Sequence, residues 1–167
     1  MQPQIPLTRD LVLIGGGHAH ALALRMWGMN PLPGARLTLI NPGPTAPYSG
    51  MLPGHIAGHY RRDEVDIDLV KLARFAGARL ILGAAEHIDP VGKNIRLNGG
   101  RRVAYDVASI DVGIHAEMPG IEGFADHALG AKPLDRYASG WADFVERAKA
   151  GEVAPQVAVI GGGVAGC

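Results

Sequence analysis

The residues most able to do chemistry lie near the start of the chain. Gly15, Gly16 and Gly17 follow the apolar run "LVLI" and precede His18 and His20. Glycines between a strand and a helix are typical of turns that bind a dinucleotide, because the N–H groups at the helix N-terminus can donate to its phosphates. The fingerprint G-x-G-x-x-G, however, asks for a third glycine where this chain has His20. Two neighbouring histidines also raise the alternative of a metal site.

The histidine spacing argues against a metal. A zinc site needs three or four ligands, and the i, i+2 spacing of His18 and His20 turns them away from a shared helix face. His55 and His59 have the i, i+4 spacing, but the glutamate of H-E-x-x-H is missing and Gly58 weakens a helix. We therefore expect no metal ligands in this chain.

The missing third glycine requires another explanation of how the helix packs on the strand. That glycine normally permits close helix-to-strand contact. We expect Ala19 and Ala21 to share this contact, with His20 pointing away from the sheet and partly exposed or packed, and with His18 near the phosphates.

A second glycine turn lies at the end of the printed sequence. The strand-like run "VAVIG" leads into Gly161, Gly163 and Gly166, which form a complete fingerprint. Two glycine turns that each follow an apolar strand are far stronger evidence for dinucleotide binding than one turn would be. Because the sequence stops where the second helix should begin, we expect it to be part of a longer protein.

The elements around these turns predict an α/β fold. Apolar runs indicate strands of a parallel sheet, amphipathic stretches indicate helices, and short alternating segments around the turn "NGG" indicate an antiparallel β-meander. Asp66 or Asp68 is expected to cap the second helix, and Gly77 to end it. The expected strands are 11–14, 35–41, 78–83 and 107–113, the helices 19–29, 65–78 and 134–150, and the meander 86–106.

Composition excludes several classes of protein. The chain has 167 residues, 47% of them hydrophobic, and its 16 basic and 16 acidic residues balance. This favours a folded domain without a nucleic-acid partner. No apolar stretch approaches the roughly 20 residues of a transmembrane helix, and no secretory signal is evident. A single cysteine fits a reducing compartment, so we expect a cytoplasmic protein.

The two glycine turns, the meander between them and the stretch "PYSGMLPGHIAGHY" resemble flavoproteins with two dinucleotide-binding domains. The chain is similar to the pyridine nucleotide-disulfide oxidoreductase superfamily, in the branch of type II NADH dehydrogenases, sulfide:quinone reductases and the flavoprotein domains fused to selenophosphate synthase. The resemblance implies a Rossmann-like FAD-binding domain with a parallel sheet and a meander (1–115), followed by the truncated start of an NAD(P)-binding domain (116–167).

The resemblance also implies which residues touch the cofactors. The FAD pyrophosphate would lie by the first turn, the adenosine ribose by the end of the second strand, the flavin by "YSGM", and NAD(P)H by the second turn. Asn41 departs from the acidic residue usual at the ribose, and "SIDVGI" departs from the relatives' alanine-threonine-glycine-serine. The implied residues are Gly15, Gly17, His18, Ala19, Asn41, Pro42, Tyr48, Ser49, Gly50, Met51, Ala85, Gly113, Gly161, Gly163 and Gly166.

The activity implied is that of an FAD-dependent enzyme that takes hydride from NAD(P)H and passes electrons to a small-molecule acceptor, a quinone or another. Catalytic residues stay unassigned, and thiol-disulfide chemistry is excluded for a portion with one cysteine. The alternative is a nucleotide-binding module without turnover, or the flavoprotein part of a selenophosphate synthase fusion. The resemblance leaves room for a homodimer and for peripheral membrane contact by a segment beyond Cys167.

Overall fold

A computed structural model describes residues 6–113, 120 and 122–161 of the chain. The chain divides into two compact units. The first contains the described residues up to Tyr48 together with Asp66–Gly113, and the second contains Ser49–Val65 together with the described residues after Gly113. Each unit has its own architecture.

The first unit is built on a parallel sheet. Its strand order is β5-β2-β1-β9, with β1 and β2 in the middle. α1 (His18–Met29) joins β1 to β2, as the glycine turn and the helix-forming residues after it predict. The four strands lie where the apolar runs predict them and are β1 (Arg9–Ile14), β2 (Ala35–Asn41), β5 (Arg79–Leu82) and β9 (Val107–Ile110).

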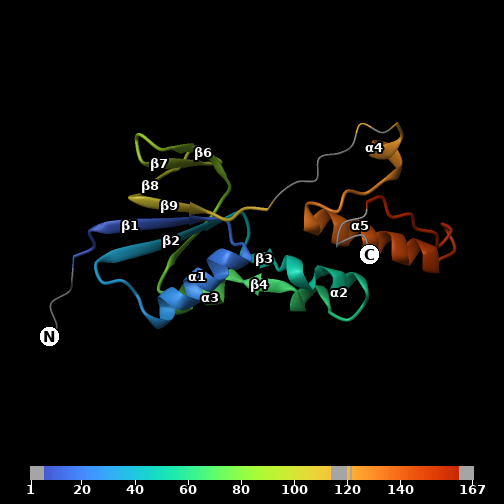
Figure 1. Ribbon diagram of the computed structural model, residues 1–167, viewed down its shortest axis with the longest axis horizontal. Helices are drawn as coiled ribbons and strands as arrows, with labels where there is room; N and C mark the ends of the chain where they lie inside the picture. Colours follow the sequence, from blue (N-terminus) through green and yellow to red (C-terminus); the bar gives the residue numbers. More distant parts are fainter. Residues whose placement is uncertain (1–5, 114–119, 121, 162–167) are drawn as a thin grey trace. The chain divides into compact units, whose positions relative to one another are not determined.

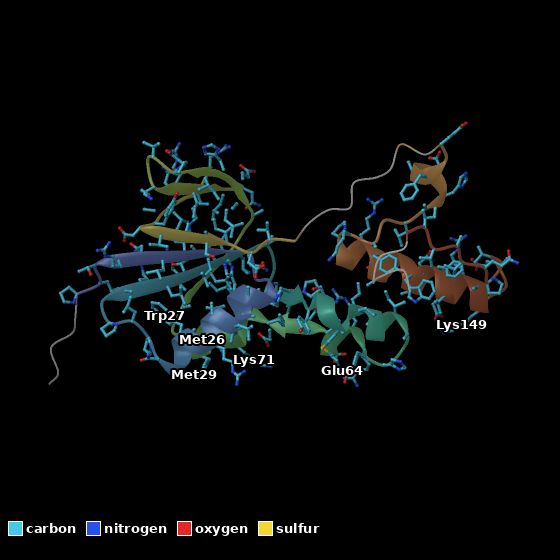
Figure 2. All side chains as sticks on the ribbon, viewed as in Figure 1. Met26, Trp27, Met29, Glu64, Lys71 and Lys149 are labelled. Carbon is cyan, nitrogen blue, oxygen red and sulfur yellow. The ribbon has the colours of Figure 1, made fainter. Side chains whose placement is uncertain are left out.

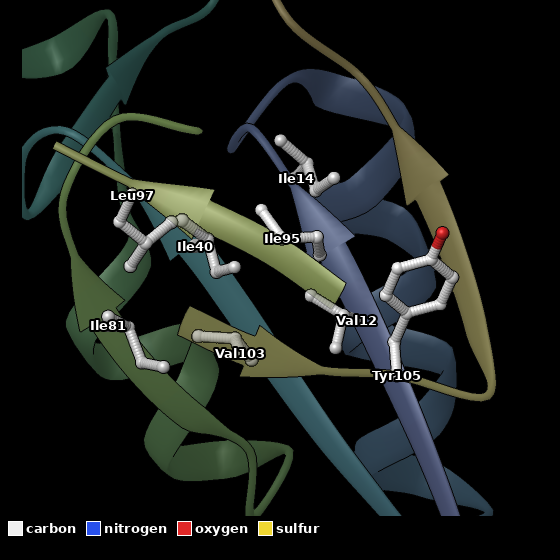
Figure 3. Close-up of a cluster of buried hydrophobic side chains, with 8 residues drawn as sticks. All are labelled: Val12, Ile14, Ile40, Ile81, Ile95, Leu97, Val103 and Tyr105. Atoms are coloured by element: carbon white, nitrogen blue, oxygen red, sulfur yellow. The ribbon is translucent and has the colours of Figure 1, made fainter. Parts of the chain in front are cut away.

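A three-stranded antiparallel meander covers one face of this sheet (Figure 1). Its strands are β6 (Ala85–Asp89), β7 (Asn94–Leu97) and β8 (Arg102–Ala104). Gly99 and Gly100 have φ of 78° and 83°, which makes the predicted "NGG" turn possible between β7 and β8. Figure 3 shows the core between the two layers, formed by Val12, Ile14, Ile40, Ile81, Ile95, Leu97, Val103 and Tyr105.

The helices α1 and α3 (Leu69–Phe75) cover the opposite face of the sheet (Figure 1). Side chains alternate along a strand, so Leu13 points to the helices while Val12 and Ile14 point to the meander. Leu24 of α1 and Leu69 of α3 are fully buried on the helix side. The outer surface of α1 carries exposed apolar side chains, including Met26 and Met29 (Figure 2). The first unit therefore has three layers, and the parallel sheet is the middle one.

α3 begins later than the sequence predicts. The expected helix started near residue 65, but Asp66–Asp68 forms β4, which pairs with β3 (Thr45–Pro47). Asp68 is the N-cap, and its carboxylate accepts a hydrogen bond of 2.9 Å from the backbone N–H of Lys71. Gly77 follows the last turn with φ of 59°, which confirms it as the stop.

The second unit is mainly helical. α2 (Leu52–Ile56) contacts α5 (Leu134–Lys149), and Ala138 of α5 is buried. The remaining elements are the short helices η1 (Ser49–Met51), η2 (Arg62–Glu64) and α4 (Phe124–His127). In the described part of the chain, no helix has the length and apolar character needed to span a membrane.

The strand predicted over "VAVIG" is absent, so that prediction was wrong. Residues 157–160 form no ladder with any described residue. Val159 and Ile160 are 67% and 70% exposed. A strand is defined by hydrogen bonds to a neighbouring strand. Apolar, β-branched residues alone therefore do not produce one here.

We expect Asp68→Ala to lower the melting temperature by about 2–4 °C, because the first turn of α3 loses its cap. The hydrogen bond from the Lys71 backbone N–H, followed by the Lys71 side chain, lowers the pKa of Asp68. Its stabilising effect is therefore present above the ordinary aspartate pKa and is lost as the pH falls through the folded-state pKa. Thermal melts of wild type, Asp68→Ala and Asp68→Asn from pH 7 downward test this. Asp68→Asn should retain most of the cap at neutral pH, and equal melts for all three proteins would contradict the assignment.

Candidate functional site

The first glycine turn lies at a topological switch point of the parallel sheet. From β1 the chain crosses to β2 on one side, and it later returns to β9 on the other side of β1. In open α/β sheets, ligands bind in the crevice beyond the carboxyl ends of the strands at such a point. Gly15 follows β1 and Asp111 follows β9, so both residues stand at the carboxyl ends of these neighbouring strands.

The backbone of Asp111 joins the turn to β9. Its N–H donates to the Ile14 carbonyl at 2.8 Å, and its own carbonyl accepts from the Gly17 N–H at 3.4 Å. Gly15 has φ of 90°, and a Cβ there would overlap the Asp111 carbonyl. A Cβ on Gly17 would overlap the Asp111 carboxylate. The chain's own packing therefore requires both glycines, in addition to any ligand.

The start of α1 offers two free donors. Gly17 is the N-cap, and the His20 N–H donates to Asp111 Oδ2 at 3.0 Å. The N–H groups of His18 and Ala19 have no acceptor within the described residues, and both residues are exposed. Free N–H groups at a helix N-terminus, together with the helix dipole, suit an anion such as a phosphate.

His20 takes the position of the third glycine in an unexpected way. It is only 4% exposed, and its Nδ1 lies 2.7 Å from the Gly15 carbonyl oxygen. A carbonyl can only accept, so Nδ1 carries a proton and donates to it, and Nε2 lies 2.9 Å from the Ser109 hydroxyl oxygen. The sequence predicts that His20 is partly exposed or packed, and it is packed. It does not, however, point away from the sheet as predicted. It ties α1 to the turn and to β9, while Ala19 is exposed.

Asn41 holds the turn from the β2 side. Its Oδ1 accepts from the Gly16 N–H at 2.9 Å, and its Nδ2 donates to the carbonyls of Gly43 and Thr45 at 2.8 and 3.3 Å. Both amide protons are thus used within the protein. A carboxylate could not donate to these carbonyls, which explains why an amide replaces the acidic residue usual at this position. Oδ1 keeps one lone pair that could receive a ribose hydroxyl.

The other predicted residues of the first unit lie beyond the carboxyl ends of the parallel strands. Pro42 follows Asn41 and is exposed. The rings of His18 and Tyr48 have centroids 6.3 Å apart. Ala85 is the first residue of β6, and Gly113 is exposed at the end of the first unit.

The remaining predicted residues belong to the second unit. Ser49, Gly50 and Met51 form η1 there. Gly161 is exposed, with φ of 129°. Gly163 and Gly166 lie outside the described residues. The structure thus brings the residues of the first glycine turn together with Asn41, and their contacts with a cofactor stay a prediction.

Sequence reasoning missed Asp111. The signal was present, because an aspartate directly follows an apolar strand and so falls at the carboxyl edge of the sheet. Its partner on α1, His20, is 91 positions away in sequence, and only the pairing of β1 with β9 brings them together.

The described part of the chain contains no cluster of three or more histidine, cysteine, aspartate or glutamate side chains that could hold a metal ion.

The fold and the glycine turn are of the kind found in dinucleotide-binding α/β proteins, and comparison with known families agrees. The family model of the pyridine nucleotide-disulphide oxidoreductases matches residues 9–167. The chain belongs to this family.

Solved structures show the same fold. The sulfide:quinone oxidoreductase of the hyperthermophilic bacterium Aquifex aeolicus has a TM-score of 0.69 at 22% identity, covering 85% of this chain and 33% of that one. NDH2 of Plasmodium falciparum, in complex with NADH, has a TM-score of 0.66 at 16% identity, covering 89% and 31%. An NAD-dependent persulfide reductase of A. fulgidus has a TM-score of 0.63 at 21% identity, covering 80% and 27%. The chain thus spans a third or less of the length of these structures.

We expect His20→Ala to destabilise the protein by about 2–4 kcal/mol, since it leaves a cavity and strips the buried Gly15 carbonyl of its donor. His18→Ala is the matched control, because His18 is exposed on the same turn and should change stability by only about 0.5 kcal/mol or less. Urea unfolding of the three proteins measures both effects. Equal stabilities for the two variants would contradict the role given to His20.

Asn41→Asp should also destabilise the protein, by about 1–3 kcal/mol, because the carboxylate faces two carbonyls to which it cannot donate. Asn98→Asp is its control. The Asn98 side chain only accepts, from the Ala84 N–H at 2.9 Å, and a carboxylate can do the same. Urea unfolding should therefore separate the two substitutions, and a harmless Asn41→Asp would show that the amide donors are dispensable.

Proposed function

We propose that this chain carries the FAD-binding part of a flavin-dependent oxidoreductase that takes hydride from NAD(P)H and passes the electrons to a small-molecule acceptor. The observation that carries the proposal is the pair of unpartnered N–H groups, on His18 and Ala19, at the switch point of the sheet. Membership of the pyridine nucleotide-disulphide oxidoreductase family supports the same cofactors.

The residues present suit the pyrophosphate of a dinucleotide. The N–H groups of His18 and Ala19 would donate to its oxygens, and Gly17 lets the backbone approach closely. Asn41 and Pro42 stand at the end of β2, where the adenosine ribose would lie. The carboxylate of Asp111 is the one feature of this turn that does not favour an anion.

The bound flavin would supply the redox chemistry, accepting hydride and releasing electrons to the acceptor. The described residues of the turn bind and orient, and we assign none of them a role in proton transfer. With a single cysteine, this chain holds no cysteine pair, so its share of the reaction does not include thiol-disulfide exchange.

Two further parts of the proposal rest on sequence and similarity. The fingerprint at Gly161, Gly163 and Gly166 would bind NAD(P)H, supported by the extent of the family match through residue 167. A quinone is the acceptor we favour, because a sulfide:quinone oxidoreductase is among the similar structures. A flavoprotein part fused to selenophosphate synthase, without turnover of its own, is the competing function.

The site is tested by Gly17→Ala in the full-length protein that contains this sequence. We expect the variant to lose bound flavin, because close approach of the pyrophosphate to the backbone would need glycine at this position. We expect it also to lose stability, because the added Cβ overlaps the Asp111 carboxylate. Flavin absorbance per protein and urea unfolding measure the two effects separately.

The double variant Gly17→Ala/Asp111→Ala distinguishes ligand contact from packing. Without the carboxylate, the destabilisation caused by Gly17→Ala should shrink, whereas the flavin should still be absent. Stoichiometric flavin in Gly17→Ala would remove the basis of the proposal. Flavin-dependent NADH or NADPH oxidation with a soluble quinone would then separate an oxidoreductase from a binding module.

A further inference from the structure

The Asp111 carboxylate lies at the N-terminus of α1, where an anion is favoured. Its Oδ2 accepts from the N–H of His20, the third residue of α1. The N–H groups of the first two residues of α1, His18 and Ala19, remain free beside it. The same carboxylate faces the Cα of Gly17 closely enough that a Cβ there would overlap it. An anion of the protein itself therefore already contacts the start of the proposed phosphate site.

This carboxylate has no cationic partner within the described residues. α1 has no acidic residue of its own in its first turn, so the negative charge there comes from the end of β9. A helix N-terminus with its dipole stabilises one anion, and a second anion beside the first is repelled.

We propose that Asp111 is an affinity-setting residue, an internal anion that opposes the phosphates of an incoming dinucleotide at this turn. The proposal rests on the proposed function for the identity of that ligand as FAD. Asp111 thereby makes the turn bind a dinucleotide phosphate more weakly than its glycines and free N–H donors alone would.

Capping alone does not account for the charge. A neutral amide oxygen accepts from a helix N–H about as well as a carboxylate does, because asparagine and aspartate are equally good caps. Asp111→Asn can thus keep the hydrogen bond to the His20 N–H while removing the charge. This substitution separates the electrostatic role from the structural one.

The test measures FAD affinity by fluorescence titration of the flavin-free, full-length protein. Asp111→Asn should bind FAD about five- to tenfold more tightly than wild type at low salt, because one negative charge next to the pyrophosphate is gone. The gain should shrink at high salt, where exposed charges are screened. Melting temperatures without ligand should stay close to wild type, since the hydrogen bond from the His20 N–H to residue 111 persists.

Asp106→Asn is the matched control. Asp106 directly precedes β9, at the end opposite Asp111, and its carboxylate accepts from the Asp10 N–H at 2.6 Å. The substitution therefore removes the same charge beside the same strand but away from the turn. Asp106→Asn should leave FAD affinity unchanged. Should Asp111→Asn fold poorly, Asp111→Ala removes the same charge and should also tighten binding, with a lower melting temperature from the lost cap.

A second probe, inorganic pyrophosphate, makes the outcomes distinguishable. Pyrophosphate should raise the melting temperature of Asp111→Asn more than that of wild type. If FAD binds wild type and Asp111→Asn equally, or binds Asp111→Asn more weakly, the role of Asp111 is overturned while the proposed function stands. If no protein binds FAD but pyrophosphate still favours Asp111→Asn, the role of Asp111 stands and the proposed function is overturned.

Discussion

The contact between the glycine turn and the first residue after β9 is the constraint on which the site depends. β9 pairs with β1 in parallel, with Ile110 opposite Ile14, and this register brings Asp111 directly over the turn. The Asp111 carbonyl and carboxylate then occupy the space that side chains at Gly15 and Gly17 would need. Glycine is therefore required here before any ligand is considered. Such a signature reports packing of the protein on itself as well as approach to a phosphate.

Two polar side chains hold the turn in place. Asn41 accepts from the Gly16 N–H on the β2 side, and His20 donates to the Gly15 carbonyl on the β9 side. In the usual fingerprint a third glycine lets the helix pack closely on the strand. Here a buried histidine makes hydrogen bonds instead, which fixes the turn by directional contacts. A turn fixed in this way loses little conformational freedom when a ligand binds.

The layered fold could be predicted because its signals are local. Apolar runs gave the four parallel strands, and the "NGG" turn gave the meander. The orientation of His20 and the role of Asp111 could not be predicted in the same way, since both depend on β9 lying next to β1. His20 is 89 positions from Ser109 and 91 positions from Asp111 in the sequence. The run "VAVIG" shows the opposite error. Its composition favours a strand, yet residues 157–160 pair with no described strand.

The origin of the charge at the start of α1 links the sheet to the site. A helix usually receives its N-terminal anion from its own N-cap or first turn, as α3 does from its N-cap Asp68. α1 has no acidic residue there and receives the charge from Asp111, the residue that follows β9. The electrostatic potential at the free N–H groups of His18 and Ala19 therefore depends on where β9 ends. A change in the position of β9 relative to β1 would change the glycine contact, the His20 hydrogen bonds and the proposed phosphate affinity together, because Ser109 lies in β9 and Asp111 directly follows it.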